Sequence, residues 1–149
     1  DMILSNQHIA QIAIDNAKKF NAPIYTQADV SIPPEMDVTY TPEVPGEPPP
    51  TFRIARGVVR WAVERGLDVL LVASAKPHMW RCLRDFDYAV HEVGALINVY
   101  PCEEVNLIPE EEWFCPDSTQ ERTRSREAWR RRERILEWMP MFLYKRVAS

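Results

Sequence analysis

Asp68-Val-Leu-Leu-Val-Ala73 is a nearly continuous apolar run, and the polar turn Ser74-Ala75-Lys76-Pro77-His78 follows it directly. Nearly continuous apolar strands are typical of parallel sheets, because helices cover both faces of such a sheet. In open parallel sheets, ligands bind beyond the carboxyl ends of the strands. The run therefore predicts a buried parallel strand with a candidate site at its end.

Helical patterns lie on both sides of this strand. From Thr51, which follows three prolines, apolar residues recur at helical spacing as far as Gly66, a residue type suited to ending a helix. The segment from His78 to Val93 shows the same spacing and ends at Gly94. The apolar run from Ala95 to Tyr100 then predicts a further strand.

The N-terminal part continues the alternation. Met2 to Ser5 is a short apolar run that we interpret as a first strand. Asn6 to Phe20 has helical spacing with Asn6 as its N-cap, and Ala22 to Thr26 predicts a second strand. Alternating strands and helices indicate βαβ units, so the fold class is α/β with a short, mostly parallel sheet.

Two segments stand outside this alternation. Seven of the 13 prolines lie between Gln27 and Pro50, and we interpret 28–50 as a Pro-rich loop, which is long enough to suggest a function or an arm. The tail after Cys102 is acidic at first, then carries seven arginines in 122–134, and its apolar residues predict an amphipathic C-terminal helix that Pro140 bends or ends. We expect one domain, 1–149.

Composition narrows the class of protein. The net charge of −4 gives no reason to expect nucleic acid as a partner. The three cysteines show neither a disulfide framework nor zinc spacing, which indicates reduced thiols and a cytoplasmic protein. No apolar run approaches the length of a membrane span or a signal-peptide core, so we expect no membrane association.

The candidate site is built from side chains that follow each expected strand. The turn after the central strand is the densest, since Lys76 and Arg81 suit an anion, His78 can transfer a proton as the catalytic residue, and Ser74 can donate a hydrogen bond. Thr51 opens a helix nearby. The residues after the first two strands are further ligand-binding candidates: Gln7, His8, Thr26 and Gln27. An ordinary capped helix start with solvated Lys76 explains the same turn about equally well.

Other chemistries have weaker support. His78 and Cys82 stand at i and i+4, as metal ligands can, but no third ligand has a recognisable spacing, so we predict no metal site. The arginine-rich run contains Glu127 and Glu133, which favours a solvated, salt-bridged helix face over RNA binding.

The segment from Val69 to Cys82 resembles the YdcF-like (SanA/ElyC-related) family of bacterial α/β domains. The family shows an apolar strand, a Ser, a short turn, a His and an Arg three residues later, here Ser74, His78 and Arg81. Glu137 to Tyr144 also looks like the family's C-terminal helix, whereas the first two turns lack the family's glycines. The resemblance implies a three-layer Rossmann-like fold with a cleft over the sheet, and S-adenosylmethionine as a candidate cofactor.

Two hypotheses of different classes follow. The first is a small-molecule-binding domain, with or without enzymatic activity, that holds an anionic or nucleotide-like ligand over the strand ends with the Pro-rich loop as a cover. The second is a non-catalytic interaction module that forms a homo-oligomer or binds a partner through the Pro-rich arm and the charged C-terminal segment.

Overall fold

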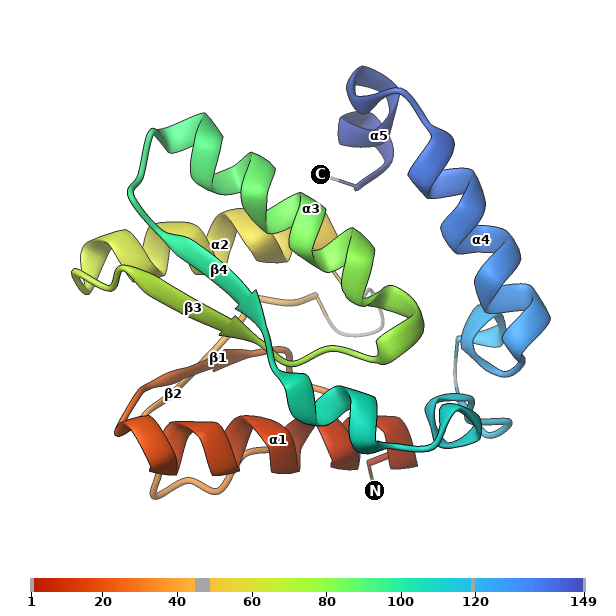
Figure 1. Ribbon diagram of the computed structural model, residues 1–149, viewed down its shortest axis with the longest axis horizontal. Helices are drawn as coiled ribbons and strands as arrows, with labels where there is room; N and C mark the ends of the chain where they lie inside the picture. The colour runs from red at the N-terminus through yellow and green to blue at the C-terminus, as the bar shows by residue number, and fades with distance from the viewer. Residues whose placement is uncertain (1, 45–48, 119, 149) are drawn as a thin grey trace.

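The computed structural model describes residues 2–44, 49–118 and 120–148. The protein is an α/β structure rich in helix, with short parallel strands (Figure 1). Its helices and strands are, in chain order, α1 (Leu4–Phe20), β1 (Ile24–Thr26), β2 (Val38–Tyr40), α2 (Thr51–Glu64), β3 (Val69–Val72), α3 (Lys76–Val93), β4 (Asn98–Pro101), the 3₁₀ turns η1 (Glu103–Leu107), η2 (Glu110–Trp113) and η3 (Glu121–Thr123), α4 (Arg126–Trp138) and α5 (Met141–Ala148).

The described strands form two separate parallel pairs. β1 pairs with β2, with Ile24 opposite Val38, and β3 pairs with β4, with Val69 opposite Asn98. The parallel pairing predicted from the sequence is confirmed. A three-layer Rossmann-like arrangement is not confirmed, because no continuous sheet joins the two pairs within the residues that the structure describes.

The largest core cluster lies between β3 and the helices α2 and α3. Ala55, Val59 and Ala62 of α2 and Phe86 of α3 pack there against Leu70 of β3. The helices end as expected, since Gly66 and Gly94 take positive φ angles of 67° and 63° that a residue with a side chain adopts at a cost. This unit supports the turn that carries the candidate site.

The predicted strand at Met2 to Ser5 is wrong, because Leu4 and Ser5 already belong to α1. The amides of Asn6 and Gln7 both donate to the carbonyl of Ile3 at 3.0 Å, which makes Ile3 the N-cap instead of Asn6. A four-residue apolar run is too short to distinguish a strand from a buried helix turn. α1 packs its Ala10 and Ala17 against Ile24 of β1.

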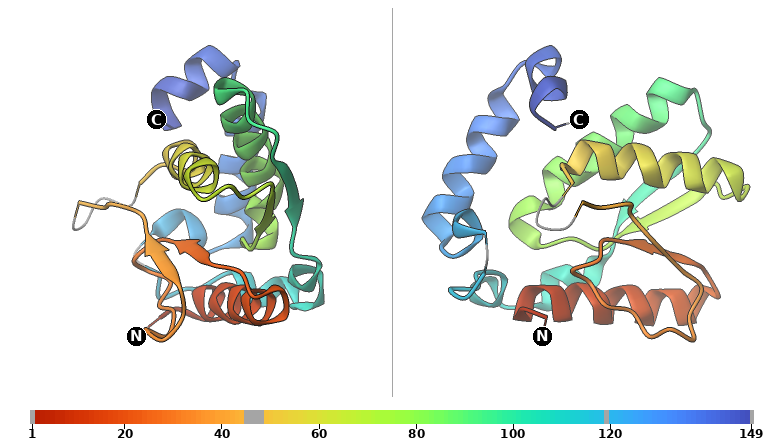
Figure 2. Two further views of the ribbon diagram at one scale, coloured as in Figure 1. Left: turned by 90° about the vertical axis from the view of Figure 1, so that its left-hand side faces the viewer. Right: turned by 180° about the vertical axis from the view of Figure 1, so that it is seen from behind.

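The C-terminal amphipathic segment is two helices, and Pro140 lies between them as the sequence predicted. Figures 1 and 2 show α4 and α5 one after the other beside the α2–α3 pair, and we call these two helices the C-terminal column. Leu136 of α4 and Tyr144 of α5 pack on Phe52 of α2, which fixes this column to the main unit.

The Pro-rich segment contains β2, and four of its residues, 45–48, lie outside the described part of the chain. Pro49 and Pro50 border the cavity described below. In the described residues, no helix combines the length and the apolar character that crossing a membrane requires.

Candidate functional site

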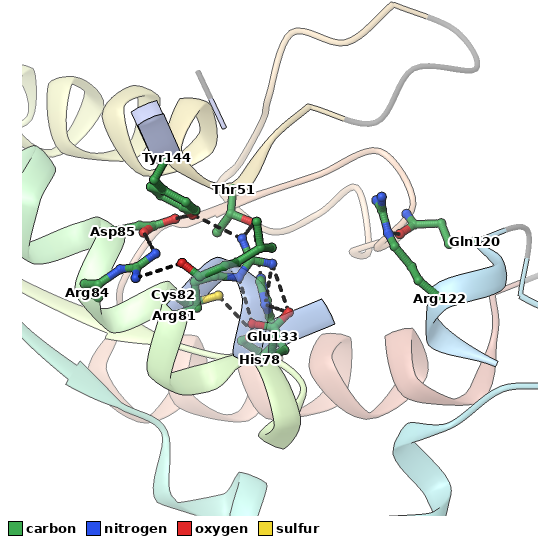
Figure 3. A network of polar contacts seen from close by, with 12 residues as sticks. Thr51, His78, Arg81, Cys82, Arg84, Asp85, Gln120, Arg122, Glu133 and Tyr144 are labelled. Carbon is green, nitrogen blue, oxygen red and sulfur yellow. Dashed lines mark hydrogen bonds and ion pairs between the residues drawn. The ribbon is translucent and has the colours of Figure 1, made fainter. Parts of the chain in front are cut away.

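The turn between β3 and α3 brings His78 and Arg81 to one side of α3. Pro77 in the first turn favours the helix start, because its fixed φ suits a helix and no backbone bond is lost there. Residues three apart share a helix face, and an Nη2 atom of Arg81 lies 3.0 Å from Nδ1 of His78. Both side chains point from α3 toward α4 (Figure 3).

Glu133 of α4 neutralises Arg81 in the interior. The carboxylate accepts from Nε of Arg81 at 2.7 Å and from Nη2 at 3.0 Å, a two-point contact that suits a guanidinium. Both residues are 4% exposed. The same carboxylate lies 3.2 Å from Nδ1 of His78, so one anion serves two cationic groups.

Thr51, Tyr144 and Asp85 complete the network. Oγ1 of Thr51 lies 3.2 Å from Nε2 of His78 and accepts from Arg81 at 3.3 Å. The hydroxyl of Tyr144 accepts from Arg81 at 3.1 Å and donates to the fully buried Asp85. Four helices therefore contribute to one cluster: α2, α3, α4 and α5 (Figure 3).

The charges of the cluster follow from burial and pairing. Burial opposes ionisation of Glu133, but hydrogen bonds from His78 and Arg81 outweigh it and lower the pKa of Glu133 to about 2. Burial likewise opposes protonation of His78, whereas Cys82 and Glu133 raise the pKa of His78 to about 9. Burial and the bond to Asp85 raise the pKa of Tyr144 to about 12.

The raised pKa of His78 favours its imidazolium form at neutral pH. In that form Nδ1–H donates to Glu133 and Nε2–H donates to Thr51. When His78 is neutral, Nδ1 can instead accept from the adjacent Nη2 of Arg81. A protonated imidazole suits a general acid or a hydrogen-bond donor to an anion, since both roles need the proton in place.

Two more arginines face the same space. A cavity of about 870 Å³ is lined by His78 and Arg81, and also by Arg122, which precedes α4, and by Arg132 of α4. Burial, with added repulsion from Arg122 and Arg81, lowers the pKa of Arg132 to about 10. Partial burial and Arg81 also lower the pKa of Arg122, although the residue as a whole remains exposed to solvent.

Neither of these two arginines has an ion-pair partner among the described residues. Nε of Arg122 donates to Gln120 at 3.1 Å, and Figure 3 shows this pair set apart from the His78–Glu133 network. The cavity wall thus carries more positive charge than Glu133 compensates, which favours an anion in the space between them.

The structure brings together some of the residues that the sequence proposed. His78, Arg81 and Thr51 are in direct contact, and Ser74, Thr26 and Gln27 line the same cavity. The hydroxyl of Ser74 is buried against the thiol of Cys82, at 3.3 Å.

Three proposed residues lie away from the cavity. Lys76 is exposed at the start of α3, as the capped-helix interpretation expects, and Gln7 bonds to the carbonyl of Met2. His8 pairs with Glu112 at 2.6 Å and meets the edge of Trp113. None of the three lines the cavity.

The sequence did not identify Glu133, Arg122, Arg132 or Asp85 as site residues. The signal for Glu133 was present, because Trp129, Glu133 and Leu136 form the buried stripe of α4 and a charged residue on such a stripe needs a partner. Arg122 and Arg132 carry no signal that separates them from the five other arginines of their run.

In the described residues no group of three or more His, Cys, Asp or Glu side chains is placed to hold a metal. Cys82, Cys102 and Cys115 are buried free thiols. Comparison of the chain with protein-family models, with curated proteins and with solved structures returned no match. The resemblance to the YdcF-like family therefore stays a prediction.

Proposed function

We propose that the protein binds a small anionic ligand, carrying phosphate or carboxylate groups, at the arginine-lined part of the cavity. The observation that carries this proposal is the pair Arg122 and Arg132, which face the cavity without a carboxylate partner among the described residues and whose pKa values are lowered. The whole cavity, about 870 Å³, also includes the space between β1 and β3, so the arginine-lined part holds a ligand smaller than the full volume.

The roles of the side chains follow from their positions. Arg122 and Arg132 bind the anion, while Arg81, already neutralised by Glu133, holds the network in place. Thr51 lies at the cavity wall, where its hydroxyl accepts from His78 and Arg81 and donates its own hydrogen to an oxygen of the ligand. If the bound ligand is a substrate, His78 supplies a proton to it through the hydroxyl of Thr51, which gives up its own hydrogen as it takes one from Nε2.

A thermal-shift screen with a matched pair of variants tests the proposal. The panel contains inorganic phosphate, nucleotides, sugar phosphates and S-adenosylmethionine, each with and without Mg²⁺. A ligand at about 100 times its Kd stabilises the fold by about 2.7 kcal/mol, which raises the Tm by several degrees. Because Arg132 lines the cavity and Arg131 is exposed on the same helix, Arg132→Gln removes the shift and Arg131→Gln keeps it.

The two arginines are chemically equal and adjacent in sequence, so their difference isolates the cavity. A shift that survives Arg132→Gln and Arg122→Gln contradicts the proposed site. A panel that shifts neither the wild type nor the control contradicts this ligand class and favours the second candidate.

The second candidate is an interaction module, and one observation favours it. Trp138 is 87% exposed at the end of α4, and Phe142 is 67% exposed on α5. A contiguous exposed apolar patch is typical of a protein contact site, and these two side chains are four residues apart in the C-terminal segment. Light scattering over a range of concentrations tests this candidate, because a homodimer through this segment dissociates in the double variant Trp138→Ser, Phe142→Ser.

A further inference from the structure

The two pairs of strands lie in one layer. Tyr25 of β1 packs its ring against Trp61 of α2, at 5.4 Å between ring centroids. Leu70 of β3 packs on the same helix through Ala55 and Val59. α2 therefore covers the same face of both pairs, and β1 and β3 run in the same direction across the molecule (Figure 1).

In the described part of the chain, the facing edges of β1 and β3 make no backbone hydrogen bonds to another strand. Ile24 donates to Asp37 and Thr26 accepts from Thr41, both at 2.8 Å, so these two residues face β2. Backbone groups alternate in direction along a strand, which turns those of Tyr25 to the opposite side, toward β3. No ladder joins β1 to β3 among the described residues.

β3 presents the matching edge. Asp68 accepts from Asn98 and Val72 accepts from Cys102, both at 2.9 Å, so β3 faces β4 through residues 68, 70 and 72. The N–H and C=O groups of Val69 and Leu71 therefore point away from β4, toward β1. These groups have no backbone partner among the described residues, so this edge is available to pair with a further strand.

The space between these edges is apolar, and we call it the β1–β3 groove. Val69 is 48% exposed and Leu71 is 42% exposed, although their strand has the sequence of a fully buried one. Both residues line the cavity, together with Ala13 and Ala17 from α1. The groove therefore has free hydrogen-bonding groups on two sides and apolar side chains on its floor.

We propose that the β1–β3 groove is the seat of one extended β-strand that leads directly into the N-terminal end of α1. A strand parallel to β1 and β3 pairs with both edges and joins the two pairs into the single sheet β2-β1-strand-β3-β4. α1 begins on the side of the molecule where β1 and β3 end (Figure 1). A strand followed by α1 and then β1 is a βαβ unit of the usual kind.

The residues that line the groove predict the amino-acid composition of this strand. Val69 and Leu71 on the floor favour β-branched or aliphatic residues, as in other central parallel strands. Proline is excluded from its centre, because both of its edges donate hydrogen bonds.

Hydrogen exchange on an extended chain tests the proposal. Five alternating valine and isoleucine residues, followed by glycine-containing turns of two, three or four residues, are placed before Met2. A matched control has prolines at the second and fourth positions of the same strand. The amides of Tyr25, Val69 and Leu71 exchange about 100-fold more slowly in at least one extended chain than in its proline control.

Three outcomes overturn the proposal. The first is equal exchange at these amides in all extended chains and their controls. The second is protection in the unextended chain that grows with concentration, which assigns the groove to a second copy. The third is protection in the unextended chain at every concentration, which shows that β1 and β3 pair directly.

If no extended chain folds, the same strand is added to the unextended protein as a blocked peptide. Slower exchange at Val69 and Leu71 than with the proline peptide supports the proposal, and unchanged exchange overturns it.

Discussion

Glu133 supplies the negative charge that compensates the buried cluster, because Arg81 and His78 both form hydrogen bonds to its carboxylate. Glu133→Gln leaves a buried guanidinium without its counter-charge. We expect a loss of about 3–5 kcal/mol in the free energy of unfolding, measured by urea denaturation. Glu127→Gln is the matched control on the exposed face of the same helix, and it costs under about 1 kcal/mol. Equal losses contradict the role of Glu133.

His78 makes stability depend on pH in the alkaline range. Its pKa rises from 6.5 in the unfolded chain to about 9 in the folded protein, so folding favours the protonated form. The contribution is complete below pH 6.5 and disappears as pH rises through 9, with a loss of up to about 3 kcal/mol.

Denaturation curves at pH 6, 7.5 and 9.5 measure this loss. His78→Gln removes the slope, whereas His91→Gln, which changes an exposed histidine on the same helix, retains it. A slope that His78→Gln leaves intact belongs to another group.

The sequence predicted the candidate site residues that lie close to one another along the chain or at the start of a neighbouring helix. His78 and Arg81 stand three residues apart at a strand-to-helix turn, and Thr51 opens the neighbouring helix. Glu133 and Tyr144 come from α4 and α5. These helices reach α3 through tertiary packing, which the spacing of residues in the sequence does not predict. Lys76 is exposed and does not line the cavity, which its charge in the sequence could not show.

At the scale of elements, α2 approaches β1 closely at Gly57. A Cβ atom at Gly57 would lie 2.9 Å from the hydroxyl of Tyr25. Gly57→Ala gains about 1 kcal/mol in helix propensity, and this contact offsets the gain in the wild type. In a Tyr25→Phe background the hydroxyl is absent, so the same substitution stabilises by about 0.5–1 kcal/mol.

A double-mutant cycle from thermal unfolding measures the coupling between Gly57 and Tyr25. Additive effects show that a methyl group at position 57 does not meet the hydroxyl of Tyr25. The cycle thereby checks one of the contacts that place both pairs of strands in one layer.

Element types were predictable wherever the apolar period was long. α2, α3 and β3 each follow a clear pattern, and glycines mark the ends of the two helices. The run at Met2 to Ser5 holds too few residues to show a period, and it was assigned wrongly. That β1 and β3 remain apart was not predictable, since pairing between strands is set by the whole sheet.

At the scale of the whole molecule, α5 ties the C-terminal column to α2. Deleting 140–149 removes the buried Tyr144 and its packing on Phe52. We expect trypsin to cut at the exposed Arg130 and Arg131 of α4 about tenfold faster or more, because α4 opens more often. Phe142→Ser, which changes an exposed residue of α5, leaves the rate unchanged. Equal cleavage rates in the deletion variant and the wild type contradict the claim that α5 holds α4 against the rest of the protein.

The bond from Arg81 to Glu133 spans 52 residues, and its bond to Tyr144 spans 63. A ribosome therefore completes α3 well before it has made either partner. During that interval the guanidinium stays hydrated, because burying it without a counter-charge is costly. A nascent chain stalled before α4 keeps this face of α3 open to chaperones and proteases, and synthesis of the last two helices is the event that closes it.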